Sequence, residues 1–142
     1  MGSLASVSAD GGSGKFLHKG QEGKDIIQIT GQSGNRISPD GKMIISAAWT
    51  AKDTTNKFGI PKTRIWKIPV DGSESTQITN KQGPYADLCP SWSPDGKSVA
   101  FMRSVPSAIS AMPFGETSIY KVNFSGGEPD LLITESKKFI IS

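Results

Sequence analysis

Short apolar runs separated by turn residues dominate the chain. Runs such as 43–49 and 98–103 are rich in β-branched or aromatic residues and are bounded by Gly, Pro, Asp and Ser, a pattern typical of β-strands. Apolar residues are adjacent at 65–66 and 119–120, whereas a sheet with one solvated face would alternate apolar with polar residues. No window of about eleven residues or more has a helical period. The pattern predicts an all-β protein whose sheets are buried on both faces.

These runs repeat along the chain. The stretch Ser-Pro-Asp-Gly-Lys at 38–42 recurs at 93–97, a separation of 93 − 38 = 55 residues. In both copies the segments that follow match in order, and the last of them ends in Ile-Thr. The first serine and this last threonine are 41 residues apart in sequence in each copy (79 − 38 and 134 − 93). Self-similarity at such a period marks repeat architectures, in which each copy is one supersecondary unit.

Turn chemistry predicts where the strands of each repeat begin and end. Proline sets φ at the second turn position, aspartate suits the third, and glycine accepts the positive φ that follows. The structural turn residues are Pro39, Asp40, Gly41, Pro94, Asp95 and Gly96. A second hairpin per repeat is indicated by Asp-Gly at 71–72 and Gly-Gly at 126–127. Four strands are therefore expected in each repeat. In the first repeat one strand ends at 38 and the others span 43–49, 64–69 and about 75–79; in the second repeat one strand ends at 93 and the others span 98–103, 118–123 and about 130–134.

Four antiparallel strands per repeat form the blade of a β-propeller. The strings CPSWSPDGKSVAFMRS (89–104) and TSIYKVNFSGGEPDLLIT (117–134) resemble the SPDG-type, WD-like propeller repeat. That repeat occurs in the periplasmic Tol-system propeller protein and in the propeller domains of the prolyl-oligopeptidase family. The resemblance spans roughly 23–142 and implies a partial propeller. A Tol-like origin would imply a periplasmic or extracytoplasmic location, although the first residues lack a signal-peptide pattern.

The repeats divide the chain into blades and parts of blades. Residues 31–79 and 80–134 are expected to form two complete blades. Residues 15–30 align without gaps to 64–79, so we expect them to form the last hairpin of a preceding blade. Residues 135–142 are expected to form the first strand of a next blade. Residues 1–14 are expected to be poorly ordered or to form part of a blade. Because propellers have four to eight blades, the chain reads as a fragment, a self-associating part of a ring, or an open stack of blades.

Composition narrows the class of protein. A hydrophobic content of 35% with 16 glycines and 9 prolines suits one turn-rich β domain. The net charge is +3, and the basic residues are scattered, which argues against nucleic-acid binding. No apolar stretch approaches the roughly 18 residues of a membrane span.

Three conspicuous residues fall in expected strands. Trp66 and Trp92 are expected in the core between blades. Cys89 is the only cysteine, so the chain cannot form an internal disulfide. Its place in an inner strand predicts a buried, unreactive thiol.

Catalytic motifs are not complete anywhere in the sequence. Residues 31–35 resemble the serine-hydrolase nucleophile motif Gly-x-Ser-x-Gly but have Asn35 in place of its last glycine. His18 is the only histidine, so a histidine cluster for a metal cannot form. Gly-Ser-Gly-Lys at 12–15 lacks the earlier glycine of a phosphate-binding loop. We expect no enzyme activity, no cofactor and no metal site.

Two long loops, 50–62 and 104–116, are the expected recognition elements. Both join second to third strands, so they emerge on one face of a propeller, where a rigid scaffold presents binding residues. Apolar residues in or beside them are the candidate binding residues: Trp49, Phe58, Ile60, Met112 and Phe114. The alternative is that these side chains fold back over the blade ends.

Three functions fit these patterns. The first is a non-catalytic scaffold whose partner is a protein or peptide. The second is an accessory propeller segment of a prolyl-oligopeptidase-type peptidase that lacks its catalytic domain. The third is an assembly unit of a multi-chain propeller, whose partners are copies of the chain itself in a homo-oligomer.

Overall fold

The computed structural model describes residues 4–18, 28–29, 34–49, 62–79, 83–106 and 114–134. The described residues form antiparallel β-sheets and no helix. A short hairpin comes first, in which β1 (Leu4–Ser6) pairs with β2 (Lys15–His18). The predicted all-β class is confirmed.

The first large sheet contains strands from residues 28–77. Its members are β3 (Gln28–Ile29), β4 (Arg36–Ile37), β5 (Met43–Trp49), β6 (Arg64–Pro69) and β7 (Thr76–Gln77). The order is β3-β5-β6-β7, and β4 also pairs with β5. Strand β6 pairs with one edge of β5. Strands β3 and β4 both pair with the other edge, β3 with residues 48–49 and β4 with residues 44–45. The sheet therefore has the four strand positions of a blade.

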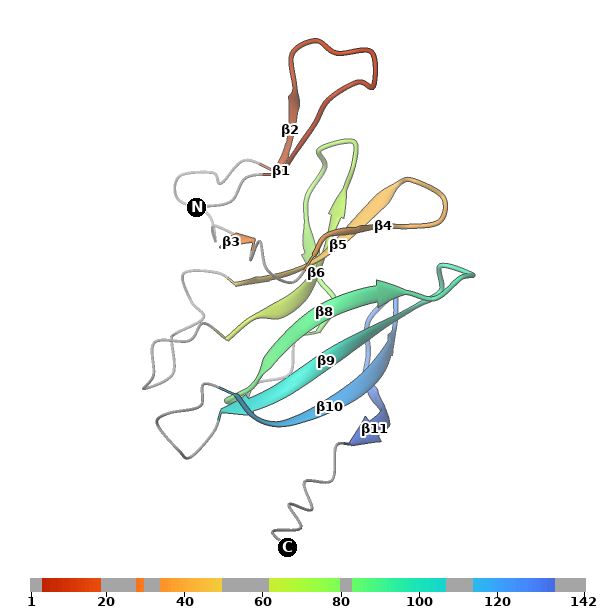
Figure 1. Cartoon of the computed structure of the whole chain (residues 1–142). Coiled ribbons are helices and arrows are strands. Elements are labelled where there is room, and N and C mark those ends of the chain that lie inside the picture. Colours follow the sequence, from red (N-terminus) through yellow and green to blue (C-terminus); the bar gives the residue numbers. More distant parts are fainter. Residues whose placement is uncertain are drawn as a thin grey trace, which may run out of the picture.

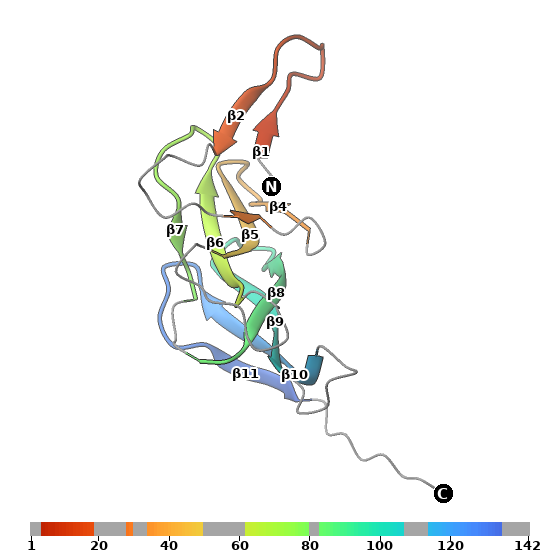
Figure 2. The ribbon, with the colours of Figure 1, turned by 90° about the vertical axis from the view of Figure 1, so that its left-hand side faces the viewer.

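The second large sheet has the order β11-β10-β9-β8. Its strands are β8 (Ala86–Trp92), β9 (Ser98–Pro106), β10 (Phe114–Asn123) and β11 (Asp130–Thr134). Figures 1 and 2 show this sheet packed beside the first, with the β1–β2 hairpin beyond the first sheet. The sequence placed β5 and β6 correctly, but β9 and β10 are longer than 98–103 and 118–123 because their pairing continues to Phe114 and Pro106.

The two Ser-Pro-Asp-Gly turns have the same geometry in both sheets. The N–H of Gly41 donates to the carbonyl oxygen of Ser38 at 2.9 Å, and Gly96 repeats this with Ser93 at 2.9 Å. The glycine φ angles are 72° and 69°. In each turn the serine hydroxyl donates to the aspartate carboxylate at 2.6 Å and accepts from the backbone N–H five residues on at 3.0 Å.

The main core lies between the two large sheets. It is formed by aliphatic and aromatic side chains that are at most 2% exposed: Ile45, Ala47, Ile65 and Ile78 from the first sheet, and Val99, Phe101 and Val122 from the second. Successive side chains alternate between the two faces of a strand. The far face of the first sheet is also buried, at Ile44, Ile68 and Trp66. The first sheet is thus covered on both faces, and the architecture is that of a partial propeller.

Cys89 corrects one expectation. Its side chain is exposed rather than buried. The pairing of β8 with β9 shifts register between Leu88 and Ser91, and Cys89 has a φ of 50°. A β-bulge of this kind interrupts the alternation of faces, so the thiol turns outward. Trp66 is buried as expected, whereas Trp92 is half-buried and packs against the core.

The N-terminal pairing also differs from the expected hairpin over 15–30. Strand β2 pairs with β1, and β3 pairs with β5 of the first large sheet. Residues 19–27 and 30 lie outside the described residues. The division of the chain at 14, 30, 79 and 134 stays a prediction.

Candidate interaction site

The candidate site lies at the end of the sheets that carries the long connections, here called the loop end. Strands β5 and β9 finish there, and β6, β8 and β10 begin there, as the pairs Ala48–Arg64, Ala86–Ser104 and Phe114–Pro106 show. The Ser-Pro-Asp-Gly turns lie at the opposite end of the same strands, because neighbouring strands are antiparallel.

The structure places two of the five candidate binding residues. Trp49 is the last residue of β5 and is half-buried. Phe114 is the first residue of β10, so it lies in a strand rather than in a loop. Both lie at the loop end. Phe58, Ile60 and Met112 fall outside the described residues.

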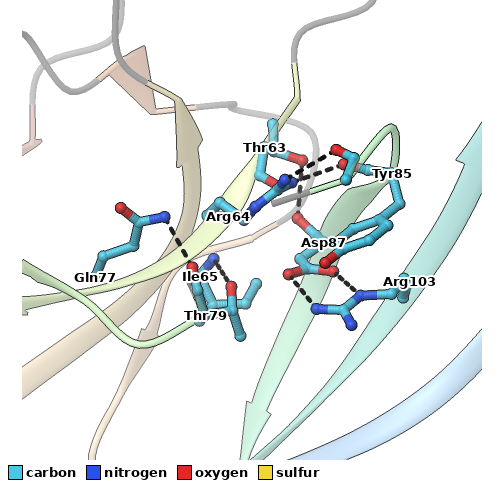
Figure 3. A network of polar contacts seen from close by, with 9 residues as sticks. Thr63, Arg64, Ile65, Gln77, Thr79, Tyr85, Asp87 and Arg103 are labelled. Carbon is cyan, nitrogen blue, oxygen red and sulfur yellow. Dashed lines mark hydrogen bonds and ion pairs between the residues drawn. The ribbon is translucent and has the colours of Figure 1, made fainter. Parts of the chain in front are cut away.

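A buried ion pair, which sequence reasoning missed, lies at this end of the second sheet. Arg103 Nε donates to Asp87 Oδ1 at 2.7 Å, and Nη2 donates to Oδ2 at 3.0 Å (Figure 3). The two residues are direct cross-strand partners in β8 and β9. Asp87 is 0% exposed and Arg103 is 8% exposed. A two-pronged bond between an arginine and a carboxylate fixes both side chains in one orientation.

Asp87 also joins the second sheet to the first. Its backbone N–H donates to the carbonyl oxygen of Thr63 at 3.0 Å. In return, Thr63 Oγ1 donates to the carbonyl oxygen of Asp87 at 2.8 Å. One residue therefore holds β9 through its side chain and the entry to β6 through its backbone.

Arg64 fixes the connection that leads into β8. Its Nη1 donates to the carbonyl oxygens of Thr63 at 2.8 Å and Tyr85 at 2.6 Å. Its Nη2 donates to the carbonyl oxygen of Gly83 at 3.2 Å. Arg64 is 4% exposed, so these bonds replace the hydration that its guanidinium group loses on burial.

The ring of Tyr85 lies against both guanidinium groups. Its centroid is 4.7 Å from Arg64 Cζ and 4.0 Å from Arg103 Cζ, which are cation–π distances. Arg103 Cζ is also 4.9 Å from the ring of Tyr120 and 5.4 Å from that of Phe101. Thr63, Arg64, Tyr85, Asp87 and Arg103 form one unit, which we call the interblade network.

Two groups of this network, Arg103 and Tyr85, have shifted pKa values. Burial alone would lower the pKa of Arg103, but the hydrogen bond and negative charge of Asp87 outweigh it and raise that pKa above its ordinary value. Burial raises the pKa of Tyr85 by more than the two neighbouring guanidinium charges lower it. Arg103 is therefore cationic and the Tyr85 phenol neutral.

The interblade network links the two sheets through hydrogen bonds and one ion pair. It pairs no nucleophile with a general base, which acyl-transfer chemistry would require. Among the described residues, no three His, Cys, Asp or Glu side chains come together as metal ligands. The described ranges also hold no helix long and apolar enough to cross a membrane. The network sets the strand ends that carry the loops at fixed positions.

Comparison with known proteins agrees with this architecture. No protein-family model matches the sequence, and no curated protein matches it either. The structure is similar to a solved structure of a protein assigned as TolB, from Agrobacterium tumefaciens, with 26% sequence identity and a TM-score of 0.62. The match covers 93% of this chain and 41% of that chain, so this chain spans less than half the length of the matched protein.

Proposed function

We propose that this chain is a non-catalytic propeller scaffold that binds a protein or peptide at its loop end. The interblade network is the observation that carries the proposal. It joins Thr63 and Arg64 of the first sheet to Tyr85 and Asp87 of the second, at the end of the sheets where the long connections leave and enter the strands. Loops held on a rigid scaffold concentrate recognition residues. The likeness to a TolB structure supports an interaction scaffold in general.

The residue types at the loop end favour a protein or peptide partner. Phe58, Ile60 and Met112 lie in the two long connections. Tyr85, just before β8 at the loop end, is half-buried and has its ring against two arginines. Aromatic residues, Met and Arg are enriched in protein interfaces, where they supply large contact areas.

We further propose that the two sheets work within a larger ring. The matched TolB chain is more than twice as long as the part that this chain covers, and propellers have four to eight blades. The remaining blades would come from the same polypeptide or from further copies. Either source would leave the loop end at one face of the ring.

Peptide selection tests the binding surface. Peptides selected from a displayed random library on the folded chain would be measured by calorimetry against the wild type and a Phe58→Ser/Ile60→Ser/Met112→Ser variant. We expect the variant to weaken binding at least tenfold and to keep its melting temperature. The matched control is Ile37→Ser, an exposed aliphatic residue at the opposite end. Equal weakening by both variants, or none by the loop variant, would contradict the proposal. Peptide esters should show no turnover.

A further inference from the structure

The outermost strand of the second sheet has an unusual surface. Strand β11 pairs with β10 and forms the sheet edge among the described strands. All five of its residues are exposed. Three of them are consecutive aliphatic residues: Leu131 is 54%, Leu132 is 50% and Ile133 is 64% exposed. An edge strand presents unpaired N–H and C=O groups, so this edge offers both hydrogen bonds and apolar surface to another strand.

The first sheet shows how such an edge is usually protected. Strand β7 occupies the corresponding outermost position and contains only Thr76 and Gln77, both polar. Short, polar edge strands discourage pairing with other chains. Strand β11 is longer and apolar, and its single charged residue, Asp130, stands at its start. At the outermost position the two repeats therefore differ in both length and polarity, two polar residues in β7 against five mostly apolar residues in β11, which indicates a separate use for β11.

We propose that β11 pairs antiparallel with β11 of a second copy of this chain, about a two-fold axis at Leu132. In that register Leu132 lies opposite its own equivalent and Leu131 lies opposite Ile133 of the second copy. Asp130 lies opposite Thr134, away from the second Asp130. Opposed aliphatic residues stabilise a strand pair, and directly opposed like charges destabilise it. The sequence Asp-Leu-Leu-Ile-Thr satisfies both conditions when read against itself.

Two-fold symmetry is the reason why a second copy of the chain fits this edge. A two-fold axis makes neighbouring edge strands antiparallel, and it gives each copy the same contact. The pairing occupies the free edge of β11 in each of the two copies, so the assembly stops at a dimer and does not propagate into a fibre. Because β11 lies on the outermost strand and not in the interblade network, this inference goes beyond the proposed loop-end function and does not depend on it.

Site-specific crosslinking tests the register. Leu132→Cys would be made in a Cys89→Ser background, which removes the one native thiol. Directly opposed residues of an antiparallel pair have Cα atoms about 4.5–5.5 Å apart, within disulfide reach. We expect mild oxidation to give a covalent dimer. Thr76→Cys in the same background is the matched control on β7 and should give no covalent dimer. Equal crosslinking at both positions, or none at residue 132, would overturn the proposal.

Sedimentation over a concentration series tests the contact without a crosslink. The wild type should pass from monomer to dimer as concentration rises. Leu132→Lys, an exposed edge substitution, should shift the dissociation constant upward at least tenfold, whereas Thr76→Lys should leave it unchanged. A wild type that stays monomeric, or a Leu132→Lys variant that associates as well as the wild type, would overturn the proposal. The loop variant described above should dimerise normally, so failure of one proposal is distinguishable from failure of the other.

Discussion

The indole Nε1 of Trp92 donates a 3.0 Å hydrogen bond to the carbonyl oxygen of Arg36, which lies in the other sheet. The Trp92 ring centroid is 5.0 Å from that of Phe124, and Lys67 Nζ of the first sheet is 4.6 Å from the Phe124 centroid. These contacts lie at the turn end, opposite the interblade network. The two sheets are therefore joined by polar contacts at both ends, with the apolar core between them.

Trp92→Ala should lower the free energy of unfolding by about 2–3 kcal/mol, less than the roughly 3–5 kcal/mol of a fully buried tryptophan, because the side chain is half-buried. Trp92→Phe keeps most of the apolar contact and removes only the donor, so we expect a loss of about 1 kcal/mol. Urea unfolding measures both. Equal losses for the two variants would show that the bond to Arg36, and not packing, dominates.

Asp87→Ala should be the most damaging change at the loop end. It leaves the buried guanidinium of Arg103 without its carboxylate, which costs about 3–5 kcal/mol. The double variant Asp87→Leu/Arg103→Met removes both charges and should be more stable than Asp87→Ala. The exposed Asp130→Ala is the control and should stay within about 0.5 kcal/mol of the wild type. Thermal and urea unfolding that gave Asp87→Ala and Asp130→Ala the same stability would contradict a buried pair.

Gly41→Ala and Gly96→Ala should each destabilise the fold by about 1–2 kcal/mol, because alanine is strained at positive φ. A Cβ at Gly41 meets nothing within 4 Å, and at Gly96 it meets Pro39 at an ordinary 3.5 Å. The cost is thus conformational and should be similar at both sites. Asn tolerates the left-handed region better than Ala, so Gly41→Asn should be milder. Calorimetric melting that ranked Asn below Ala would oppose this explanation.

Acid should weaken both turns. The hydroxyl of Ser38 and then the N–H of Lys42 lower the pKa of Asp40; Ser93 and Lys97 do the same for the pKa of Asp95. A carboxylate whose folded pKa is depressed stabilises the fold above its unfolded pKa of about 3.9, and this contribution disappears as pH falls through the folded pKa.

The pH dependence can be isolated by substitution. Asp40→Asn/Asp95→Asn keeps an acceptor oxygen in each turn but removes the titration. Urea midpoints measured from about pH 5 down to pH 2 should fall less steeply for this double variant than for the wild type. Parallel curves would mean that the turns do not contribute to acid sensitivity.

The repeat, the strands and the turn glycines could be predicted from the sequence because they depend on local chemistry. Residues 43–49 and 64–69 form strands as expected, since β-branched runs between turn signals leave few alternatives. Strands β9 and β10 extend beyond their apolar runs because cross-strand hydrogen bonds continue past the pattern. That extension is a property of the pair of strands and is not visible in either one alone.

The interblade network could not be predicted in the same way. Asp87 and Arg103 meet because the β8–β9 register makes them opposite residues, and the bulge at Cys89 affects that register. The available signal was a single charged residue in each of two otherwise uncharged strands, since buried charges require partners. The same bulge explains why the thiol of Cys89 faces outward against expectation.

The two outer sides of this pair of sheets differ, because the far face of the first sheet is buried and part of the second sheet is exposed. Ile44, Ile68 and Trp66 are already covered within the chain, whereas Ile133 on the second sheet is largely bare. A protein engineer who wished to lengthen the array would have to graft a new repeat beside the second sheet. A graft on the other side would need to displace side chains that are already packed.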